Sequence, residues 1–439
     1  MDRRQFISSA GSLALLASMS TAHADEKPSG AWHRRPRGGT PPTPAPPTGP
    51  AKHRVIVIGG GMAGATVAKY LRLWGDSVEV FLIERSTTYT SNIMSSLVLT
   101  GQRTMASLSF SYDALFNAYG VQVFRDEVTE IDPVGVKVRL ASGTQLAADR
   151  IVLAPGIDFD TVPGLGSSDR MPHAWKAGTQ TTLLAQQLAA MPDNGVAALT
   201  IPRTPYRCPP GPYERACLVA DWLKLHKPRA KLLVLDANPD FVTERDNFSS
   251  AFSDLHGGVI KYFNNVEVLQ VDPATMSVAT GSQTFRNLDV VNLIPRQRAG
   301  ALVAATGLAN ATEGRFAAVD PLTYASTVAP RVHVIGDASA TTQPKAGHIA
   351  NQEAKVCADA IIRSLGGLAP DPAPVTNSAC FSTITMSQAS WLTAVFQYNP
   401  VSGTMQAVGA SSAASTGWNK ENFGQMNTWF KALMADSFG

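Results

Sequence analysis

A glycine-rich turn between an apolar run and a helical pattern constrains this chain most. Four apolar β-formers, Val55–Ile58, run into Gly59, Gly61 and Gly64, and apolar residues then recur at helical spacing. This is the strand, turn and helix order of a dinucleotide site. Gly59 permits the turn, Gly61 lets the backbone approach a pyrophosphate, and Gly64 allows close helix–strand packing. The helix N-terminus offers unpaired N–H groups to phosphate.

A second apolar run, from residue 78 to 83, ends at Glu84. An acid at this distance from the glycines accepts a hydrogen bond from a ribose 2′-OH and disfavours a 2′-phosphate. We therefore count Met62, Ala63, Glu84 and Arg85, with the three glycines, as dinucleotide-binding residues. The alternative is a glycine-rich β–α turn that binds nothing.

The composition indicates a multidomain protein. The chain has 439 residues, 44% hydrophobic and 16% charged, enough apolar mass for two or three domains. The net charge of +3 is too small to suggest a nucleic-acid partner.

The first 24 residues have the pattern of a twin-arginine signal peptide. Arg3 and Arg4 precede a short apolar stretch and then Ala22-His-Ala24, an A-x-A cleavage site. The stretch is too short to anchor the chain in a bilayer, so we expect a periplasmic protein without an integral membrane anchor. The alternative is a disordered N-terminus with a chance arginine pair. Residues 25–52 are rich in proline and indicate a linker.

A second β–α–β unit begins at residue 196. Residues 196–201 and 231–236 read as strands, and Tyr213–His226 reads as a helix. Prolines in the turn at 202–213 remove N–H donors and fix φ, so this turn cannot cradle a pyrophosphate. We expect a second nucleotide-type domain that binds no NAD; the alternative is an unusual NAD site.

Two later segments return to the first domain. The buried strand that ends at Ala154-Pro155-Gly156 is typical of two-domain flavoproteins. The strand 331–337 ends at Gly336 and Asp337, whose carboxylate suits a hydrogen bond to a ribityl chain; the alternative is a buried capping aspartate. A turn with Gly347 then precedes a predicted helix, Asn351–Leu365, whose N-terminal dipole would stabilise reduced flavin.

These patterns predict an α/β protein with two Rossmann-like three-layer domains and a C-terminal α+β domain. The FAD-binding domain comprises residues 53–165 and 300–368, the second domain residues 166–299, and the C-terminal domain residues 369–439. The C-terminal domain is rich in aromatic residues, which form a core, a flavin cover or a docking face.

The four cysteines are Cys208, Cys217, Cys357 and Cys380. An oxidising compartment permits disulfides, but spacing alone leaves three complete pairings open. There is no C-x-x-C and no Cys/His cluster at metal spacing, so we predict no metal site.

From about residue 54 to the C-terminus the chain resembles the flavoprotein subunit of flavocytochrome c sulfide dehydrogenase, among the disulfide-reductase-like flavoproteins that include sulfide:quinone oxidoreductase. Four runs carry the resemblance: PHAWKAG (172–178), RCPPGPYERA (207–216), VNLIPRQRAG (291–300) and VHVIGDAS (332–339). The resemblance implies a redox-active disulfide beside FAD, formed by Cys208 and Cys380. It also maps catalytic roles onto Glu214 and Trp429.

Glu214 has an alternative role, and the other two cysteines have a separate expectation. Glu214 could instead be a first-turn carboxylate that interacts with the helix dipole. Cys217 and Cys357 lie in predicted helices and are expected to be buried free thiols rather than a second disulfide.

One position departs from the family pattern. The family often tethers FAD through a cysteine where this chain has Asn92. An amide forms no thioether, so we predict non-covalent FAD.

The resemblance implies oxidation of sulfide to sulfur or polysulfide. Hydrosulfide opens the disulfide, and the electrons pass through FAD to a c-type cytochrome. No C-x-x-C-H occurs in the chain, so the haem must be on another polypeptide. Alternatives are a quinone-coupled sulfide oxidase, a thiol-oxidising flavoprotein, and a flavin- or sulfur-binding subunit without turnover.

Overall fold

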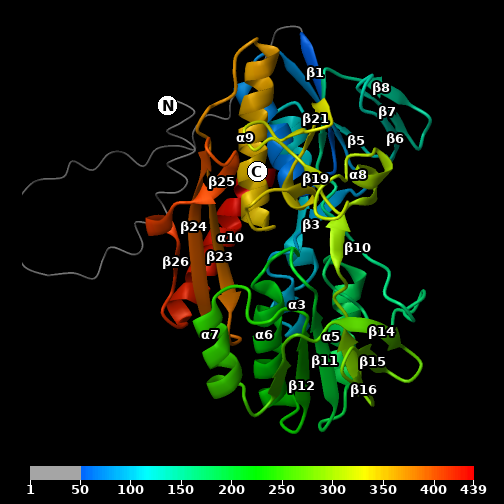
Figure 1. Ribbon diagram of the computed structural model, residues 1–439, viewed down its shortest axis with the longest axis vertical. Coiled ribbons are helices and arrows are strands. Elements are labelled where there is room, and N and C mark those ends of the chain that lie inside the picture. Colours follow the sequence, from blue (N-terminus) through cyan, green and yellow to red (C-terminus); the bar gives the residue numbers. More distant parts are fainter. Residues whose placement is uncertain (1–50) are drawn as a thin grey trace, which may run out of the picture.

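The computed structural model describes residues 51–439 (Figure 1). The predicted signal peptide and, apart from Ala51 and Lys52, the predicted linker lie outside these residues. Within them, no helix combines the length and the apolar character that a membrane crossing needs.

The first sheet has six strands in the order β20-β21-β9-β1-β2-β5. Central β1 (His53–Ile58) pairs in parallel with β2 (Val78–Ile83) and β9 (Arg150–Leu153). Residues 55–57 are fully buried, as expected of a parallel strand covered on both faces. The outer strands are β5 (Gln122–Phe124), β21 (Ala329–Val334) and β20 (Ala325–Ser326).

Two long helices follow strand ends of this sheet. α2 (Met62–Trp74) comes directly after β1. α9 (Gly347–Leu365) packs along α2. Both helices put apolar residues into the same buried cluster as the sheet. The strand, glycine turn and helix predicted at residues 55–74 are therefore present.

The second sheet is fully parallel, in the order β13-β12-β11-β17. The predicted strands 196–201 and 231–236 are confirmed as β11 (Val196–Ile201) and β12 (Lys231–Asp236). The other elements are β13 (Ile260–Phe263), β17 (Val290–Asn292), α5 (Thr179–Ala190), α6 (Gly211–His226) and α7 (Arg245–Ser250). This sheet forms the lower lobe in Figure 1, with its own apolar clusters.

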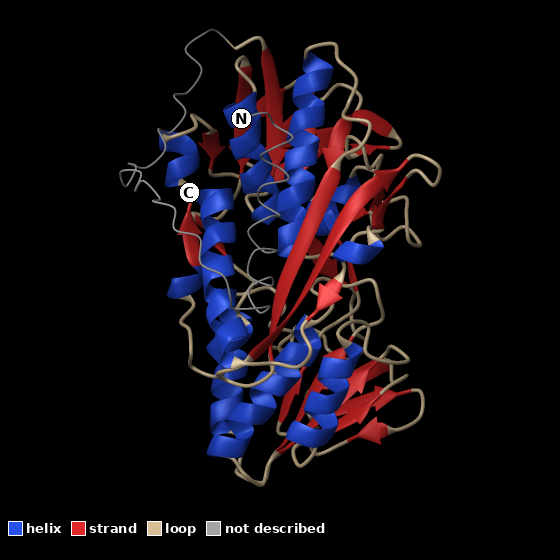
Figure 2. Cartoon of the chain, turned by 90° about the vertical axis from the view of Figure 1, so that its left-hand side faces the viewer, coloured by secondary structure: helices blue, strands red, loops and turns tan. Residues whose placement is uncertain are grey.

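The C-terminal segment lies along one side of both lobes. Its long antiparallel strands, β23 (Val375–Thr383) and β24 (Ala389–Asn399), cross the face seen in Figure 2. β25 (Thr404–Ala407) and β26 (Ala413–Ala414) pair with β24. β23 contacts both α9 and α6, and α10 (Lys420–Phe438) buries apolar residues in the core of the first sheet.

The remaining short elements connect these layers. They are β3 (Thr88–Thr90), α3 (Ser96–Leu99), η1 (Ala106–Leu108), β4 (Ser109–Ser111), α4 (Asp113–Asn117), β6 (Val128–Asp132), β7 (Lys137–Leu140), β8 (Gln145–Ala147), β10 (Ile157–Phe159), η2 (Ala251–Leu255), β14 (Val268–Asp272), β15 (Ser277–Thr280), β16 (Thr284–Phe285), β18 (Gln297–Ala299), α8 (Ala301–Ala305), β19 (Ala317–Ala318), η3 (Gly336–Ala338), β22 (Ser339–Ala340) and η4 (Gly409–Ser411).

The predicted α/β class is confirmed, but some boundaries differ. The predicted helix start at Asn351 is wrong, because α9 already begins at Gly347 and the N–H of Ala350 donates to the carbonyl of Ala346 at 2.9 Å. A Cβ at position 347 would lie 2.8 Å from Cδ1 of Ile93, so this first helical turn leaves little room for a side chain. α6 likewise begins at Gly211, two residues early, with Pro212 in its first turn. The strand predicted to reach Asp337 ends at Val334.

Candidate active site and cofactor cavity

A cavity of ≈ 470 Å³ lies between the first sheet, the second lobe and the C-terminal strands. It has the size of a small-molecule site, and it lies where the parallel strands of the first sheet end. The structure brings nearly all predicted site residues to its wall. They are Gly59, Gly61, Met62, Ala63, Glu84, Arg85, Asn92, Ala154, Pro155, Gly156, Cys208, Glu214, Gly336, Asp337, Gly347, Cys380 and Trp429.

The three glycines of the first turn occupy different environments. Gly59 has φ +97°, and a Cβ there would lie 2.5 Å from the carbonyl oxygen of Ala154. Gly64 does not line the cavity; a Cβ on it would lie 1.7 Å from the carbonyl oxygen of Gly59, so this glycine serves helix–strand packing. A Cβ on Gly61 would meet no atom within 4 Å, so this glycine leaves open space on the cavity side.

Glu84 is held at the end of β2 by backbone donors. Its Oε2 accepts from the N–H of Gly60 at 2.8 Å, and its Oε1 accepts from the N–H of Ser86 at 2.7 Å. A carboxylate has about four acceptor sites, so this one can still accept from a ribose hydroxyl.

The end of β21 carries a cluster of buried charges. Burial raises the pKa of Asp337, whereas Arg207 and Lys345 oppose that rise. Lys345 donates to the carbonyl oxygen of Asp337 at 2.9 Å. Glu353 of α9 accepts from the N–H of Gly336 at 2.7 Å, and burial raises its pKa to about 7. Sequence reasoning missed Glu353, whose only signal was a carboxylate within an otherwise buried stretch of helix.

Cys208 and Cys380 also lie on the wall of the cavity, and both are free thiols in the structure. Cys208 has φ +58°, and its N–H donates to the carbonyl of Lys345 at 2.7 Å. Burial raises the pKa of both thiols, that of Cys380 to about 12; Cys380 and then Glu214 add to the rise at Cys208. The three groups therefore lie close enough to interact, while the Cys208–Cys380 disulfide stays a prediction.

Cys217 and Cys357 do not line this cavity. Both are fully buried free thiols, in α6 and α9, as predicted.

Glu214 lies in the first turn of α6, so its position suits both readings that the sequence left open. Burial raises its pKa to about 7, although the Oγ1 of Thr383 donates to its Oε1 at 2.8 Å. Its carboxyl group therefore gains and loses a proton near neutral pH.

The C-terminal domain contributes Trp429, whose ring lies 5.7 Å from that of Phe381 and 6.2 Å from that of His348. Within residues 51–439, the buried indole nitrogen of Trp429 has no hydrogen-bond partner. His348 was missed by sequence reasoning. Its Nδ1 accepts from the N–H of Ala379 at 3.0 Å, and burial lowers its pKa to about 4, so it is neutral with its proton on Nε2.

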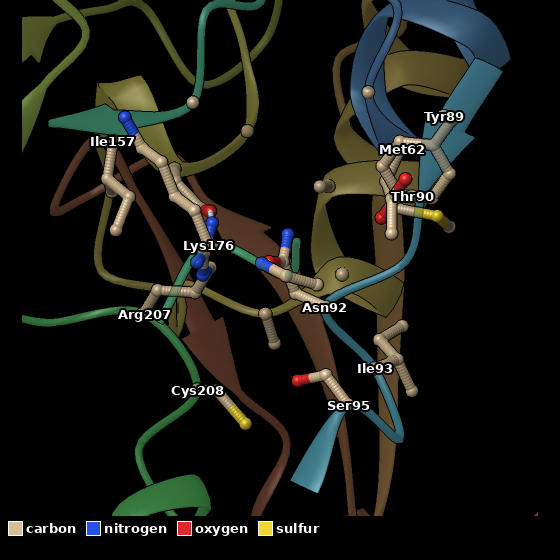
Figure 3. A pocket seen from close by; sticks show the side chains of 18 of the residues that line it. Met62, Tyr89, Thr90, Asn92, Ile93, Ser95, Ile157, Lys176, Arg207 and Cys208 are labelled. Atoms are coloured by element: carbon tan, nitrogen blue, oxygen red, sulfur yellow. Dashed lines mark hydrogen bonds and ion pairs between the residues drawn. The ribbon is translucent and has the colours of Figure 1, made fainter. Parts of the chain in front are cut away.

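The segment from residue 173 to 178 crosses the cavity edge from the second lobe. Buried Arg215 donates to the carbonyl of Ala174 at 2.9 Å and lies over the Trp175 ring at 4.6 Å. Asn92 reaches this segment from the first lobe, and its Oδ1 accepts from the N–H of Ala177 at 2.8 Å. Lys176 and Arg207, which sequence reasoning also missed, line the cavity here (Figure 3). Their only signal was that both lie within runs that carry the family resemblance.

The residues fit FAD. The glycine turn leaves room for a ligand at Gly61. Glu84 and Asp337 line the cavity after the ends of β2 and β21. Among the described residues, the indole N–H of Trp429 has no hydrogen-bond acceptor. A buried donor without a partner is rare in a folded protein, so a bound group that accepts from it is expected.

Family models match successive parts of the chain. Residues 53–190 match pyridine nucleotide-disulphide oxidoreductase, 181–295 the central part of the sulfide dehydrogenase (flavocytochrome c) flavoprotein chain, and 372–438 the flavin-binding part of flavocytochrome c sulphide dehydrogenase.

Individual relatives agree with these matches. The flavoprotein chain of sulfide dehydrogenase (flavocytochrome c) from Chlorobaculum thiosulfatiphilum is 44% identical over 45 residues, which are 10% of this chain and 94% of that sequence. Mitochondrial sulfide:quinone oxidoreductase from Schizosaccharomyces pombe is 25% identical over 325 residues, 65% of this chain and 68% of that one. The alignments with curated relatives span from 27% to 94% of those relatives.

The solved structure of sulfide:quinone oxidoreductase from Aquifex aeolicus has the same fold, with a TM-score of 0.73 at 16% identity over 88% of this chain and 91% of that one. Fold, cavity and family matches agree that this chain is an FAD-dependent oxidoreductase. It belongs to the flavocytochrome c sulfide dehydrogenase flavoprotein family, within the disulfide-reductase-like flavoproteins.

Proposed function

We propose that this protein is a periplasmic sulfide dehydrogenase flavoprotein subunit that oxidises sulfide and passes electrons to a c-type cytochrome. The observation that carries the proposal is that Cys208 of the second lobe and Cys380 of the C-terminal domain line one cavity with the glycine turn and the end of β21. Two sulfurs beside a flavin cavity suit an exchange between sulfide and a disulfide.

The sulfur step is a thiol–disulfide exchange. Hydrosulfide bonds to one sulfur of a Cys208–Cys380 disulfide; the disulfide bond breaks, leaving a persulfide and a thiolate. Re-forming the disulfide from these two groups releases one zero-valent sulfur, one proton and two electrons.

Glu214 is suited to accept the proton that this step releases. A group with a pKa near the working pH transfers protons best, and its pKa is about 7. It lies close enough to both sulfurs to affect their pKa values.

Bound FAD would accept the electron pair and release electrons one at a time. We propose that it is held without a covalent bond, because Asn92 offers an amide where the family often has a cysteine. Glu84 would hold the ribose, the α2 N-terminus the pyrophosphate and Asp337 the ribityl chain. The turn after β11 contributes Arg207 and Cys208 to the wall of the cavity. We also propose that the second lobe binds no NAD.

The predicted signal peptide supports the periplasmic location, and the family supports a c-type cytochrome as the acceptor. Twin-arginine export carries folded proteins, which suits a protein that loads its cofactor before export. The acceptor haem would be on a partner chain.

The test is a sulfide titration of the purified flavoprotein, followed by a c-type cytochrome. The proposal expects the flavin absorbance to bleach with sulfide and to recover as the cytochrome is reduced. A flavin spectrum that sulfide leaves unchanged would contradict it and favour a passive binding subunit.

A second candidate is quinone-coupled sulfide oxidation. It is favoured by the likeness to proteins named sulfide:quinone oxidoreductase. A soluble quinone offered to the sulfide-reduced protein separates the two: reoxidation by quinone, with no reduction of cytochrome, would select this candidate.

A further inference from the structure

Two cations that the proposed mechanism does not use lie together on one wall of the cavity. Arg207 comes from the turn after β11, and Lys176 comes from the segment before α5. Figure 3 shows their side chains next to each other, with the Asn92 side chain pointing toward Lys176.

Within residues 51–439, each cation has one acidic partner at ion-pair distance, and Lys176 also lies over the Phe159 ring at 5.4 Å. Arg207 lies 3.8 Å from Asp337, and Lys176 lies 3.6 Å from Asp158. Charge-assisted hydrogen bonds are shorter, about 2.7–2.9 Å. A guanidinium has five N–H donors, and here its other described acceptor is the carbonyl of Trp175, so donors remain for a ligand.

The two cations are held in place through their backbones. The N–H of Arg207 donates to Oε1 of Gln297 at 2.8 Å, and its carbonyl accepts from the indole of Trp175 at 3.2 Å. The N–H of Ala177, next to Lys176, donates to Asn92 at 2.8 Å. The backbone at both positions is therefore held in place, while the Lys176 side chain itself stays half exposed.

The positive charge extends along the cavity. Burial lowers the pKa of Lys176, and the nearby charges of Arg207 and Arg85 lower it further, against the opposing effect of Asp158. Arg85 directly follows Glu84, the residue predicted to bind the ribose. Arg207 directly precedes Cys208, one of the two cysteines on the cavity wall. Glu84, Glu214 and Asp337 also line the cavity, so the attraction for an anion is local to the wall that carries Lys176 and Arg207.

We propose that Lys176 and Arg207 form an anion-binding subsite on the second-lobe wall of the cavity, positioned by the hydrogen bond from Ala177 to Asn92. The inference rests on the proposed function, which brings two anions into the cavity: the pyrophosphate of FAD and hydrosulfide. Asn92 then has a role of its own, since it joins the two lobes at the position where the family often has a covalent link.

The experiment replaces the charges by neutral side chains, Lys176→Met and Arg207→Gln, singly and together. Arg203→Gln is the matched control, because Arg203 belongs to the same turn, pairs with Glu267 at 2.7 Å and does not line the cavity. FAD release is followed by the fluorescence of free FAD after dilution of the holoprotein. The rate constant for bleaching by sulfide is followed by absorbance.

Both rates are measured over a range of ionic strength, because salt screens electrostatic attraction but not packing. If the subsite binds an anion, removing each charge should change the rate of FAD release or the rate of bleaching by about tenfold or more. This is the size expected for a hydrogen bond to a charged group. The subsite also predicts that the affected rate loses most of its dependence on salt. A packing defect alone would leave that dependence unchanged.

The two rates identify the anion. Faster FAD release with unchanged sulfide kinetics assigns the subsite to the pyrophosphate, and slower bleaching with unchanged FAD release assigns it to hydrosulfide. The inference is overturned if both variants behave as Arg203→Gln does. Failure of the wild-type flavin to bleach would contradict the proposed function and leave the FAD measurement valid.

Asn92→Ala tests the positioning role separately. It should change the same rate in the same direction by a smaller factor and leave part of the salt dependence, because both charges are still present. Wild-type values in this variant would remove Asn92 from the inference.

Discussion

The hydroxyl of Thr383 donates to the carboxylate of Glu214 at 2.8 Å, linking the end of β23 to the first turn of α6. Burial favours the protonated carboxyl group, and the hydroxyl opposes it by stabilising the ionised form. The charge of Arg215 also opposes burial, and the resulting pKa is about 7. A residue of the C-terminal domain therefore lowers the proton affinity of a residue in the second lobe.

Thr383→Val should raise the pKa of Glu214 further, because it removes a donor to the charged form. A hydrogen bond of about 1 kcal/mol corresponds to somewhat less than one pKa unit. If ionised Glu214 accepts the proton, the rate of bleaching by sulfide rises with pH through a midpoint near 7. That midpoint should move to higher pH in the variant, as stopped-flow absorbance would measure.

Glu214→Gln is the reference for this experiment, since sulfide itself ionises and contributes its own pH dependence. In this variant only the substrate's contribution should remain. Identical midpoints for wild type and Thr383→Val would exclude Glu214 as the group that titrates.

Cys208→Ser and Cys380→Ser should each retain FAD and lose bleaching by sulfide, because neither variant can form the disulfide that hydrosulfide opens. The control is Cys217→Ala, which changes a fully buried thiol in α6 away from the cavity. It should still bleach, although it is less stable by about 1 kcal/mol. Bleaching that persists in Cys380→Ser would remove the disulfide from the mechanism.

The sequence was most informative where the signal is local. Strands β11 and β12 match the predicted ranges because parallel strands buried on both faces read as unbroken apolar runs. The glycine turn and Glu84 could likewise be predicted, because each directly follows the end of its strand in the sequence. The start of α9 was misplaced because a glycine indicates a turn more often than a helix start.

The sequence could not predict contacts that join distant segments. Asn92 suggested only the loss of a tether, because its partner Ala177 is 85 residues away and belongs to the other lobe. His348 and Glu353 were missed for the same reason. Their roles depend on Ala379 and Gly336, which only the folded chain brings to them.

The glycines of the first turn give a paired prediction. Gly61→Val should fold normally but purify with little FAD, because its side chain extends into space that meets no protein atom within 4 Å. Gly64→Ala should lose about 3 kcal/mol or more of folding free energy, because its Cβ would overlap the carbonyl oxygen of Gly59.

Circular dichroism reports the fold of each glycine variant, and absorbance reports its FAD content. The two variants serve as controls for each other, since they lie three residues apart on one turn. A Gly61→Val protein with full FAD content would mean that the cofactor does not pass this glycine.

The side chain of Asp436 ties α10 to the two helices of the first lobe. It lies 2.8 Å from Nζ of Lys355, and it accepts from Tyr70 at 2.6 Å and from Asn351 at 2.7 Å. Burial alone would raise its pKa, but the charge of Lys355 and these hydrogen bonds outweigh burial, so its pKa is lowered. The stabilisation is therefore complete above the pKa of the unfolded chain, near 3.8, and is lost as the pH falls through the lower pKa of the folded state.

Asp436→Asn should reduce the free energy of unfolding by about 2–4 kcal/mol at pH 7, because Lys355 stays buried after losing this carboxylate. The difference between wild type and variant should shrink as the pH is lowered below 4, because the wild-type carboxylate then becomes protonated. Thermal unfolding midpoints measured from pH 7 to pH 2.5 test this dependence. Asp246→Asn, at a fully exposed side chain, is the control and should stay within about 0.5 kcal/mol of wild type. A difference between Asp436→Asn and wild type that stayed constant with pH would show that the ionised carboxylate is not what stabilises the fold.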